Sequence, residues 1–390
     1  MSEQFRGPLA GRRIIEIAGI GPGPFCGMML ADHGADVIRV ERPGGTQAGS
    51  GGSSAMDPLQ RSRRTIIADL KTPDGVEIVK RLVRSADGLI EGFRPGVMER
   101  LGLGPDVLLA ENPKLVYGRI TGWGQTGPWA AKAGHDINYI ALAGTLHAIG
   151  VAGGRPVAPL NLVADFGGGG MLLAFGMLAA MLDAERSGAG QVVDAAMTEG
   201  AALLTAMVWG FRAQGRWNDA RGTNALDGGA HYYDTYETAD GKYIALGAVE
   251  TQFYVQMGKL LGLGVEELTA AVQRDPARWE GLKAKVAGLV AGQTRSYWDA
   301  IFAGADACYA PVLSFDEALA HPHNRARETF ATIGGVAQPL PAPRYSRTKT
   351  AMPEMAKPAG EDSVALLREA GFDDADIERI CASGALALPN

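Results

Sequence analysis

The first third of the chain alternates short apolar segments typical of β-strands with segments of helical periodicity. Strands are predicted over residues 13–18, 36–41, 64–70, 88–91 and 115–121, and helices over residues 25–33, 72–86 and 97–102. Strands that alternate with helices favour a parallel sheet covered by helices. The sequence therefore predicts an α/β fold for this part of the chain.

The pattern changes further along the chain. Helices are predicted over residues 136–149, 168–186 and 198–214, with a strand over 191–196. Beyond residue 222, strands are predicted over 232–236 and 243–247, and helices over 252–261, 277–291 and 296–302. This change predicts a smaller α+β domain over about residues 222–330, followed by a proline-rich and then helical tail over 331–390.

Composition narrows the class of protein. With 390 residues, 46% hydrophobic and 21% charged, the chain can build a sizeable core. A net charge of −6 does not favour nucleic acid as a partner. Cys26, Cys308 and Cys381 are far apart, which predicts neither disulfides nor a metal site and favours the cytoplasm. The polar start of the chain lacks the apolar core of a signal peptide, and the apolar run 167–182 is shorter than the ~20 residues of a membrane span, so no span is expected.

The first strand leads into a glycine-rich turn, as in dinucleotide-binding folds. The turn has Gly19 and Gly21, and Glu41 follows about 20 residues later at the end of the next strand. Pro24 stands where the third glycine of that fingerprint belongs, the glycine that lets helix and strand pack closely. The sequence of this turn favours an ordinary tight turn, with Pro24 at the first helical position, over a nicotinamide or flavin site.

Cations follow several of the predicted strands. Arg42, Lys71 and Arg94 come directly after or close to strand ends, and Arg100 lies nearby. Ligands of open parallel sheets bind beyond the carboxyl ends of the strands, so these cations could converge on a polyanion. Taken one at a time, each of them is more simply interpreted as a solvated loop charge, and only as a set do they indicate a polyanion site as readily.

Four acidic or basic residues are candidates for proton chemistry. His135 and Asp136 lie between a turn and a helical segment, where free N–H groups could stabilise an oxyanion; helix capping by Asp136 is the simpler interpretation. Asp165 precedes the glycines 167–170, which suggest that a bulky group passes close to the backbone. Glu250 follows an apolar strand in the smaller domain and would, by itself, be a surface acid. His321-Pro322-His323 predicts an exposed turn rather than a metal site.

A series of ordered motifs resembles one known family, the family III CoA-transferases, over nearly the whole chain. The segments that carry the resemblance are GPLAGRRIIEIAGIGPGP, GADVI with ERP, ADLK, EGFRPGV with RLG, TGWGQTGP and GHDINY. Transferases of this family usually carry a Gly-Tyr-Asp or similar triplet where this chain has Gly134-His135-Asp136. The histidine is typical of the α-methylacyl-CoA racemases within the family.

The resemblance implies a fold and an assembly. It implies a Rossmann-like large domain with a parallel sheet over 1–198 and 331–390, a linker helix over 199–221 and the small α+β domain over 222–330. It also implies an interlocked homodimer, with the active site between the large domain of one chain and the small domain of the other. The substrate would be an acyl-CoA thioester, and no further cofactor or metal would be needed.

The resemblance also implies roles for individual residues. His135 and Asp165 would exchange the α-proton on opposite faces, Glu250 would pair with His135, Asp136 would begin the helix that receives the enolate oxygen, and the glycines after Asp165 would let the thioester lie against the backbone. The residues that would bind CoA or substrate are Arg42, Ala68, Leu70, Lys71, Gly92, Phe93, Arg94, Arg100, Gly134, Asn138 and Tyr139. Methionines such as Met197 and Met207 would line the acyl path, although Val208 and Phe211 interrupt them.

Alternative functions remain open from the sequence. A CoA-transferase would use Asp165 as the nucleophile and form an acyl anhydride. A non-catalytic acyl-CoA binding protein would not need His135. A nucleotide-dependent oxidoreductase would bind flavin or nicotinamide. The interconversion of (R)- and (S)-2-methylacyl-CoA thioesters through an enolate is the function that the sequence favours.

Overall fold

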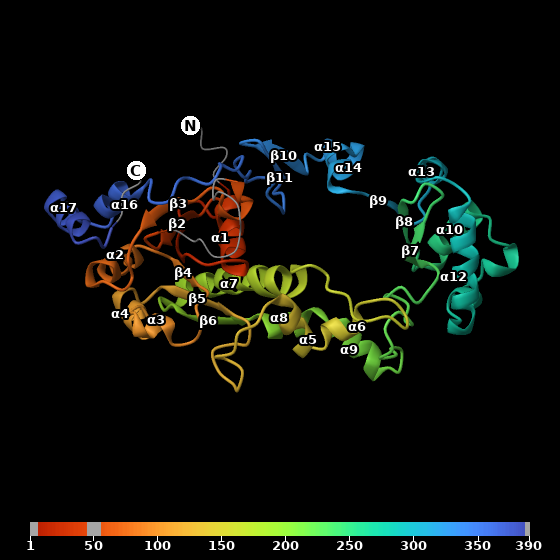
Figure 1. The fold of residues 1–390 in the computed structure, drawn as a ribbon, viewed down its shortest axis with the longest axis horizontal. Coiled ribbons are helices and arrows are strands. Elements are labelled where there is room, and N and C mark those ends of the chain that lie inside the picture. Colours follow the sequence, from red (N-terminus) through yellow and green to blue (C-terminus); the bar gives the residue numbers. More distant parts are fainter. Residues whose placement is uncertain (1–6, 45–55, 387–390) are drawn as a thin grey trace. The chain divides into compact units, whose positions relative to one another are not determined.

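The computed structural model describes residues 7–44 and 56–386, and the chain forms two compact units (Figure 1). The first unit comprises residues 1–143, 160–204 and 328–390, and the second comprises residues 144–159 and 205–327. The C-terminal tail thus belongs with the N-terminal part of the chain. The segment 144–159, which the sequence analysis left with the large domain, groups with the second unit.

A parallel sheet forms the centre of the first unit. Its strands lie in the order β3 (Arg64–Ile67), β2 (Asp36–Glu41), β1 (Arg13–Ile17), β4 (Gly88–Glu91), β5 (Val116–Thr121) and β6 (Gln191–Ala196). Every pairing is parallel; Ile15, for example, lies opposite both Ile38 and Leu89. The order reverses between β1 and β4, so the carboxyl ends of these two strands border the crevice where ligands of such sheets bind.

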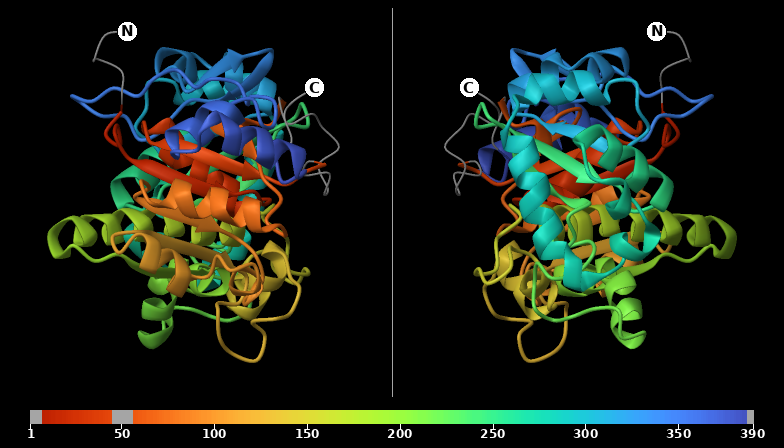
Figure 2. Two further views of the ribbon diagram at one scale, coloured as in Figure 1. Left: turned by 90° about the vertical axis from the view of Figure 1, so that its left-hand side faces the viewer. Right: turned by 90° about the vertical axis from the view of Figure 1, so that its right-hand side faces the viewer.

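Helices cover both faces of this sheet. On one face lie α2 (Pro73–Val83), α4 (Pro105–Glu111), α16 (Ser363–Glu369) and α17 (Asp374–Ala382). Ile78, Leu366 and Ile380 from these helices are buried in the same cluster as Ile38 and Leu89. The opposite face carries α1 (Pro22–Asp32) and α7 (Leu172–Ser187). Figure 2 shows the dark blue helices of the tail beside the orange helices of the first third, in front of the red strands.

Several segments differ from the sequence prediction. Strand β3 ends at Ile67, because the chain turns over residues 69–72, where the Asp69 carboxylate accepts a hydrogen bond from Lys71 N at 3.0 Å. Gly144, with φ of 82°, separates α5 (Asp136–Leu142) from α6 (Thr145–Ala148) where a single helix is predicted. Thr205 leaves helical geometry between α8 (Met197–Leu204) and α9 (Ala206–Ala213), so the predicted helix 198–214 is two helices. Strands β9 (Tyr309–Val312), β10 (Phe330–Ile333) and β11 (Val336–Pro339) are not anticipated by the sequence analysis.

The long apolar helix before β6 is longer than its sequence suggests. A π-helical segment η4 (Leu162–Met171) continues directly into α7. Within the described ranges, Leu162–Ser187 is the helix that is long and apolar enough to cross a membrane by length and composition alone. The expectation that this apolar segment is too short to cross a membrane is therefore wrong about the length of the helix. Leu173 and Met177 are buried against Gly118 of β5, as a helix that covers a sheet requires.

The second unit is built around the antiparallel sheet β7 (Tyr233–Glu237), β8 (Tyr243–Gly247) and β9. Its larger helices are α10 (Thr251–Leu261), α12 (Pro276–Ala291) and α13 (Arg295–Phe302). Shorter helices are η5 (Val265–Glu267), α11 (Ala270–Gln273), α14 (Phe315–Ala320) and α15 (Pro322–Ala326), while η3 (Pro58–Gln60) and α3 (Val97–Arg100) belong to the first unit. The core of this unit combines aromatic side chains, among them Tyr254, Trp279 and Trp298, with aliphatic ones.

Candidate active site

The cations predicted from the sequence lie at one edge of the parallel sheet. Arg42 follows β2, Lys71 follows β3 by a short turn, and Arg94 follows β4. All three side chains are exposed, as is Arg100 at the end of α3. Because the strands are parallel, their carboxyl ends lie at the same edge. The structure thus places on one edge the cations that the sequence proposed for a polyanion.

A buried carboxylate holds the loop that carries Arg94. Glu91, the last residue of β4, is completely buried, and its Oε2 accepts a hydrogen bond from Phe93 N at 2.7 Å. Its Oε1 accepts another at 2.7 Å from Arg119 Nε. Burial raises the pKa of Glu91, while the Phe93 N–H and the Arg119 charge act to lower it. The backbone of Gly92 and Phe93 is therefore fixed from inside the protein.

The segment from Gly134 to Tyr139 presents His135 to solvent. His135 precedes α5, and its backbone N–H donates to Asn138 Oδ1 at 3.1 Å while its carbonyl accepts from Asn138 N at 2.8 Å. The Tyr139 hydroxyl donates to Gly134 O, and its ring packs against Trp123 with the centroids 4.8 Å apart. Asn138 and Tyr139 thus hold the backbone on both sides of His135, whose imidazole is exposed.

Asp136 connects this segment to Asp165. Its side chain is only 4% exposed, and Oδ2 accepts hydrogen bonds from Ala164 N at 2.7 Å and from Asp165 N at 2.8 Å. Asp136 is therefore the first residue of α5 rather than its cap, and its carboxylate binds the first turn of η4 instead. This contact between residues far apart in the chain could not be found from the local pattern, which suggested capping.

Asp165 lies half-buried at this junction. Its Oδ2 accepts a hydrogen bond from Asn161 Nδ2 at 3.1 Å. Burial and then the negative charge of Asp136 raise the pKa of Asp165, and the Asn161 hydrogen bond and the charge of His135 oppose this shift. Burial also raises the pKa of Tyr139 to about 12, a shift that the Asp165 charge strengthens and the Arg94 charge weakens. Arg94, His135, Asp136, Tyr139 and Asp165 thus form one electrostatic environment.

The glycines after Asp165 serve the packing of the protein itself. A Cβ on Gly168 would lie 2.7 Å from Ala201 N in α8, and one on Gly170 would lie 2.6 Å from Pro22 O in α1. The expectation that a thioester lies against these glycines is therefore wrong for Gly168 and Gly170, because α8 and α1 already occupy that space. The close approach of η4 to two helices is what these glycines allow.

The glycine turn after β1 forms another wall of the site. Gly21 has φ of 67°, and a Cβ built on it would lie 3.7 Å from Asp165 Oδ2. The close packing of helix and strand that the missing third glycine would provide comes from Gly27, where a Cβ would lie 2.2 Å from Glu16 Oε2. The sequence analysis did not single out Gly27, although it lies only three residues after Pro24.

Buried charges beneath α1 were also missed by the sequence analysis. Arg39 is buried and forms ion pairs with Glu16 and Glu41. Its Nε lies 2.5 Å from Glu41 Oε1. Arg63 Nε lies 2.7 Å from Glu16 Oε2, and Arg63 also donates to Pro24 O. We call these four residues the buried charge cluster. It binds the turn at Pro24, and Arg39 Nη2 reaches Gly19 O at 3.4 Å. Alternation of charged and apolar residues in β1 and β2 is the sequence feature that could have indicated it.

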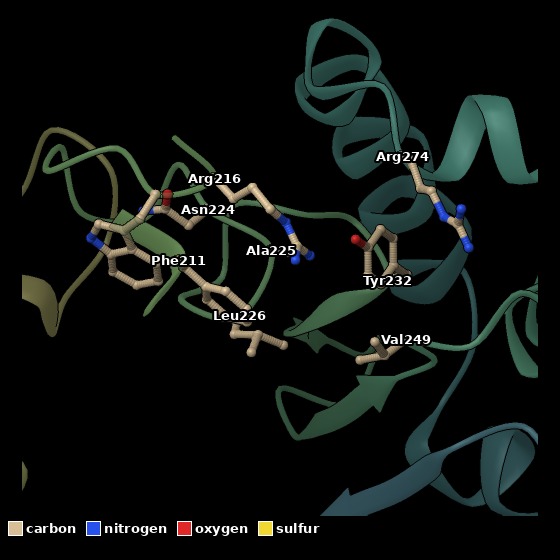
Figure 3. Close-up of a pocket in the computed structure, with 9 residues that line it drawn as sticks. Phe211, Arg216, Asn224, Ala225, Leu226, Tyr232, Val249 and Arg274 are labelled. Atoms are coloured by element: carbon tan, nitrogen blue, oxygen red, sulfur yellow. The ribbon is translucent and has the colours of Figure 1, made fainter. Parts of the chain in front are cut away.

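Glu250 belongs to the second unit, where it directly precedes α10. It is exposed, and its carbonyl accepts a hydrogen bond from Tyr254 N at 3.0 Å. In the same unit, a cavity of about 480 Å³ is bordered by Val249, the residue before Glu250 (Figure 3). Ala68, by contrast, is buried in the first unit and bridges to Leu386 of the tail, with Leu70 half-buried nearby.

Comparison with known proteins places the chain in a family. The family model described as CoA-transferase family III matches residues 9–363. The chain belongs to the family III CoA-transferases. It is 48% identical to an alpha-methylacyl-CoA racemase of Mus musculus over 95% of both chains. It is 44% identical to the Homo sapiens protein of that name, over 95% of this chain and 96% of the other.

A solved structure supports the same placement in this family III group. A CAIB/BAIF family protein from Brucella suis matches with a TM-score of 0.80 and 27% identity, over 94% of this chain and all of the other. The α/β fold with a parallel sheet and a smaller antiparallel sheet, predicted from the sequence in outline, is confirmed.

Proposed function

We propose that this family III protein is a racemase that interconverts (R)- and (S)-2-methylacyl-CoA thioesters. The observation that carries the proposal is the pair of hydrogen bonds from Ala164 N and Asp165 N to Asp136. Since Asp136 follows His135 directly, this carboxylate ties together two segments that each bear one proton-transfer group. The relatives named as racemases, 48% and 44% identical to this chain, support the same activity.

In this mechanism one group removes the α-proton and the other returns a proton to the opposite face. Starting from one enantiomer, the Asp165 carboxylate takes the proton, the C–H electron pair moves into the enolate, and the His135 imidazolium protonates the α-carbon from the other side. The opposite direction begins with neutral His135 as the base and ends with the Asp165 carboxylic acid as the donor. The raised pKa of Asp165 favours this step, because a carboxyl group whose pKa lies closer to neutral pH is more readily protonated and can then donate the proton.

The enolate oxygen needs a positive environment. We assign it to the N–H groups in the first turn of α5, beside His135. Glu250 of a second subunit would pair with His135 and set its tautomer. This assignment requires the interlocked homodimer implied by the family resemblance. Exposed apolar side chains support such an assembly, among them Phe175 at 70%, Leu182 at 69% and Trp209 at 57%.

The CoA part of the substrate is assigned to the edge that bears the cations. Arg42, Lys71, Arg94 and Arg100 would contact its phosphates, with backbone contacts from residues 68–71, 92–93 and 134. No further cofactor takes part in the proposed reaction. The cytoplasmic location and the dimer remain predictions from the sequence.

The deciding experiment incubates one enantiomer of a 2-methylacyl-CoA in D2O without a second acid or any added cofactor. We expect loss of optical purity together with incorporation of deuterium at the α-carbon. Chiral chromatography measures the first and mass spectrometry the second. If neither occurs, and an added acceptor acid receives CoA while Asp165 becomes acylated, the protein is a CoA-transferase instead.

A further inference from the structure

The cavity of the second unit combines an apolar wall with positive charge. Phe211, Leu226 and Val249 contribute apolar surface, and Arg216 and Arg274 contribute guanidinium groups (Figure 3). Its volume of about 480 Å³ lies within the range of small-molecule sites.

Its cations have no carboxylate partner. Among the residues that the structure describes, neither Arg216 nor Arg274 forms a salt bridge. Arg216 Nη1 donates only to the Gln214 amide oxygen, at 3.2 Å, and its guanidinium carbon lies 4.9 Å from the centroid of the Phe211 ring. A carboxylate near these guanidinium groups would gain charge-assisted hydrogen bonds, whereas a cationic ligand would be repelled.

A buried phenol completes the polar lining. Tyr232 is 5% exposed, and its hydroxyl makes no hydrogen bond to any residue in the described ranges. Figure 3 shows this hydroxyl on the side of the ring that faces Arg216, with the Arg274 guanidinium on the other side. Of the carboxylates on neighbouring segments, Asp234 pairs with Lys283, and Asp227 accepts from Gly222 N and Asn224 N. Glu250, next to Val249, is the carboxylate that the proposed mechanism pairs with His135. The Tyr232 hydroxyl and the Arg216 guanidinium therefore lie on the same side of the ring and are available to an anion, and Arg274 adds positive charge on the other side.

The position of the cavity connects it to the reaction. Val249 borders it and Glu250 follows in the chain, so the cavity lies next to the residue assigned to the reacting end of the substrate. We propose that the cavity receives the far end of the acyl chain, and that Arg216, Arg274 and Tyr232 select 2-methylacyl thioesters whose chain ends in a carboxylate. This inference rests on the proposed racemase function and names its substrate class.

The test compares two substrates that differ only at the chain end. The probes are 2-methyldecanoyl-CoA and the 1-CoA thioester of 2-methyldecanedioic acid, with deuterium exchange at the α-carbon as the readout. We expect the wild-type kcat/KM to be about tenfold higher for the diacid thioester, since its terminal carboxylate can form charge-assisted hydrogen bonds that the methyl end cannot. Arg216→Gln and Arg274→Gln should each lower this ratio about fivefold or more, and Tyr232→Phe about threefold.

Arg212→Gln is the matched control. Arg212 lies on the same helix as Phe211, but it pairs with Asp219 and does not border the cavity, so its loss should leave the ratio unchanged. A wild-type ratio near one, or equal losses for both substrates in Arg216→Gln and Arg274→Gln, would overturn the inference.

A third substrate separates the two proposals. Short 2-methylbutanoyl-CoA has no chain end to reach the cavity. If it exchanges deuterium while the diacid shows no advantage, the racemase function stands and the inference fails. If none of the three thioesters exchanges deuterium, the proposed function fails and the inference falls with it.

Discussion

The sheet edge of the first unit and the cavity of the second unit hold their polar groups in opposite ways. At the sheet edge, buried carboxylates bind backbone N–H groups: Glu91 holds Phe93, and Asp136 holds Asp165. In the cavity, Arg216 and Arg274 have no charged partner in the described structure. Proton transfer requires atoms held in place, whereas the attraction between a cation and a carboxylate falls off only gradually with distance. This contrast fits proton transfer at the sheet edge and selection of the acyl chain end in the cavity.

The largest expected effect concerns the two proton-transfer groups. His135→Ala and Asp165→Ala should each lower turnover about 10³-fold, because general acid–base catalysis contributes roughly 10²–10⁴-fold. Each variant should slow deuterium exchange most from a different enantiomer, since each group serves one face. Exchange is measured from both enantiomers by mass spectrometry, and equal small losses in the two variants would contradict the two-base assignment.

The buried charge cluster should matter most for stability. Arg63→Met leaves the fully buried Glu16 carboxylate with less compensating charge, which should cost roughly 3 kcal/mol or more of unfolding free energy. Chemical denaturation of the whole protein gives this value. Arg368→Met, at the exposed pair with Asp374, is the control and should cost under about 1 kcal/mol. Similar losses in both variants would show that burial does not distinguish these pairs.

The link between Asp136 and Asp165 can be separated into geometry and charge. Asp136→Ala leaves Ala164 N and Asp165 N without an acceptor and should lower kcat about 100-fold. Asp136→Asn keeps an oxygen for these N–H groups but removes a charge that raises the pKa of Asp165. Its kcat should fall less, and the limb of the pH profile in which Asp165 acts as a base should move to lower pH. A profile that does not move would refute the electrostatic coupling.

The smallest expected effect is on the pH dependence of stability and comes from His231, in the core of the second unit. His231 is buried with Nε2 3.0 Å from the Tyr254 hydroxyl, and burial lowers its pKa from 6.5 to about 4. The unfolded chain then binds more protons between these values, so this contribution to stability is complete above pH 6.5 and is lost as the pH falls towards 4. Thermal unfolding of wild type and His231→Gln should show a smaller acid-induced loss of Tm in the variant. If Tm falls equally with decreasing pH in both proteins, His231 does not contribute to the acid sensitivity of stability.

The parts that could be predicted from sequence are those that local patterns encode. Alternating strands and helices indicated the parallel sheet, and the cations after β2, β3 and β4 indicated its ligand edge. Breaks such as Gly144 and Thr205 were missed, because helical periodicity continues across both positions. The short strands β10 and β11 were missed because their proline-rich surroundings carry little periodicity.

By itself, the sequence determined the fold class, the order of the motifs and the residue types available for proton transfer. The tertiary structure decided what Asp136 does, since its partners Ala164 N and Asp165 N lie 28 and 29 residues away. It also decided that Gly168 and Gly170 face α8 and α1, and that two arginines without carboxylate partners in the described structure border an apolar cavity. The physical reason is that periodicity and capping act within a few residues, whereas these contacts join segments that only folding brings together.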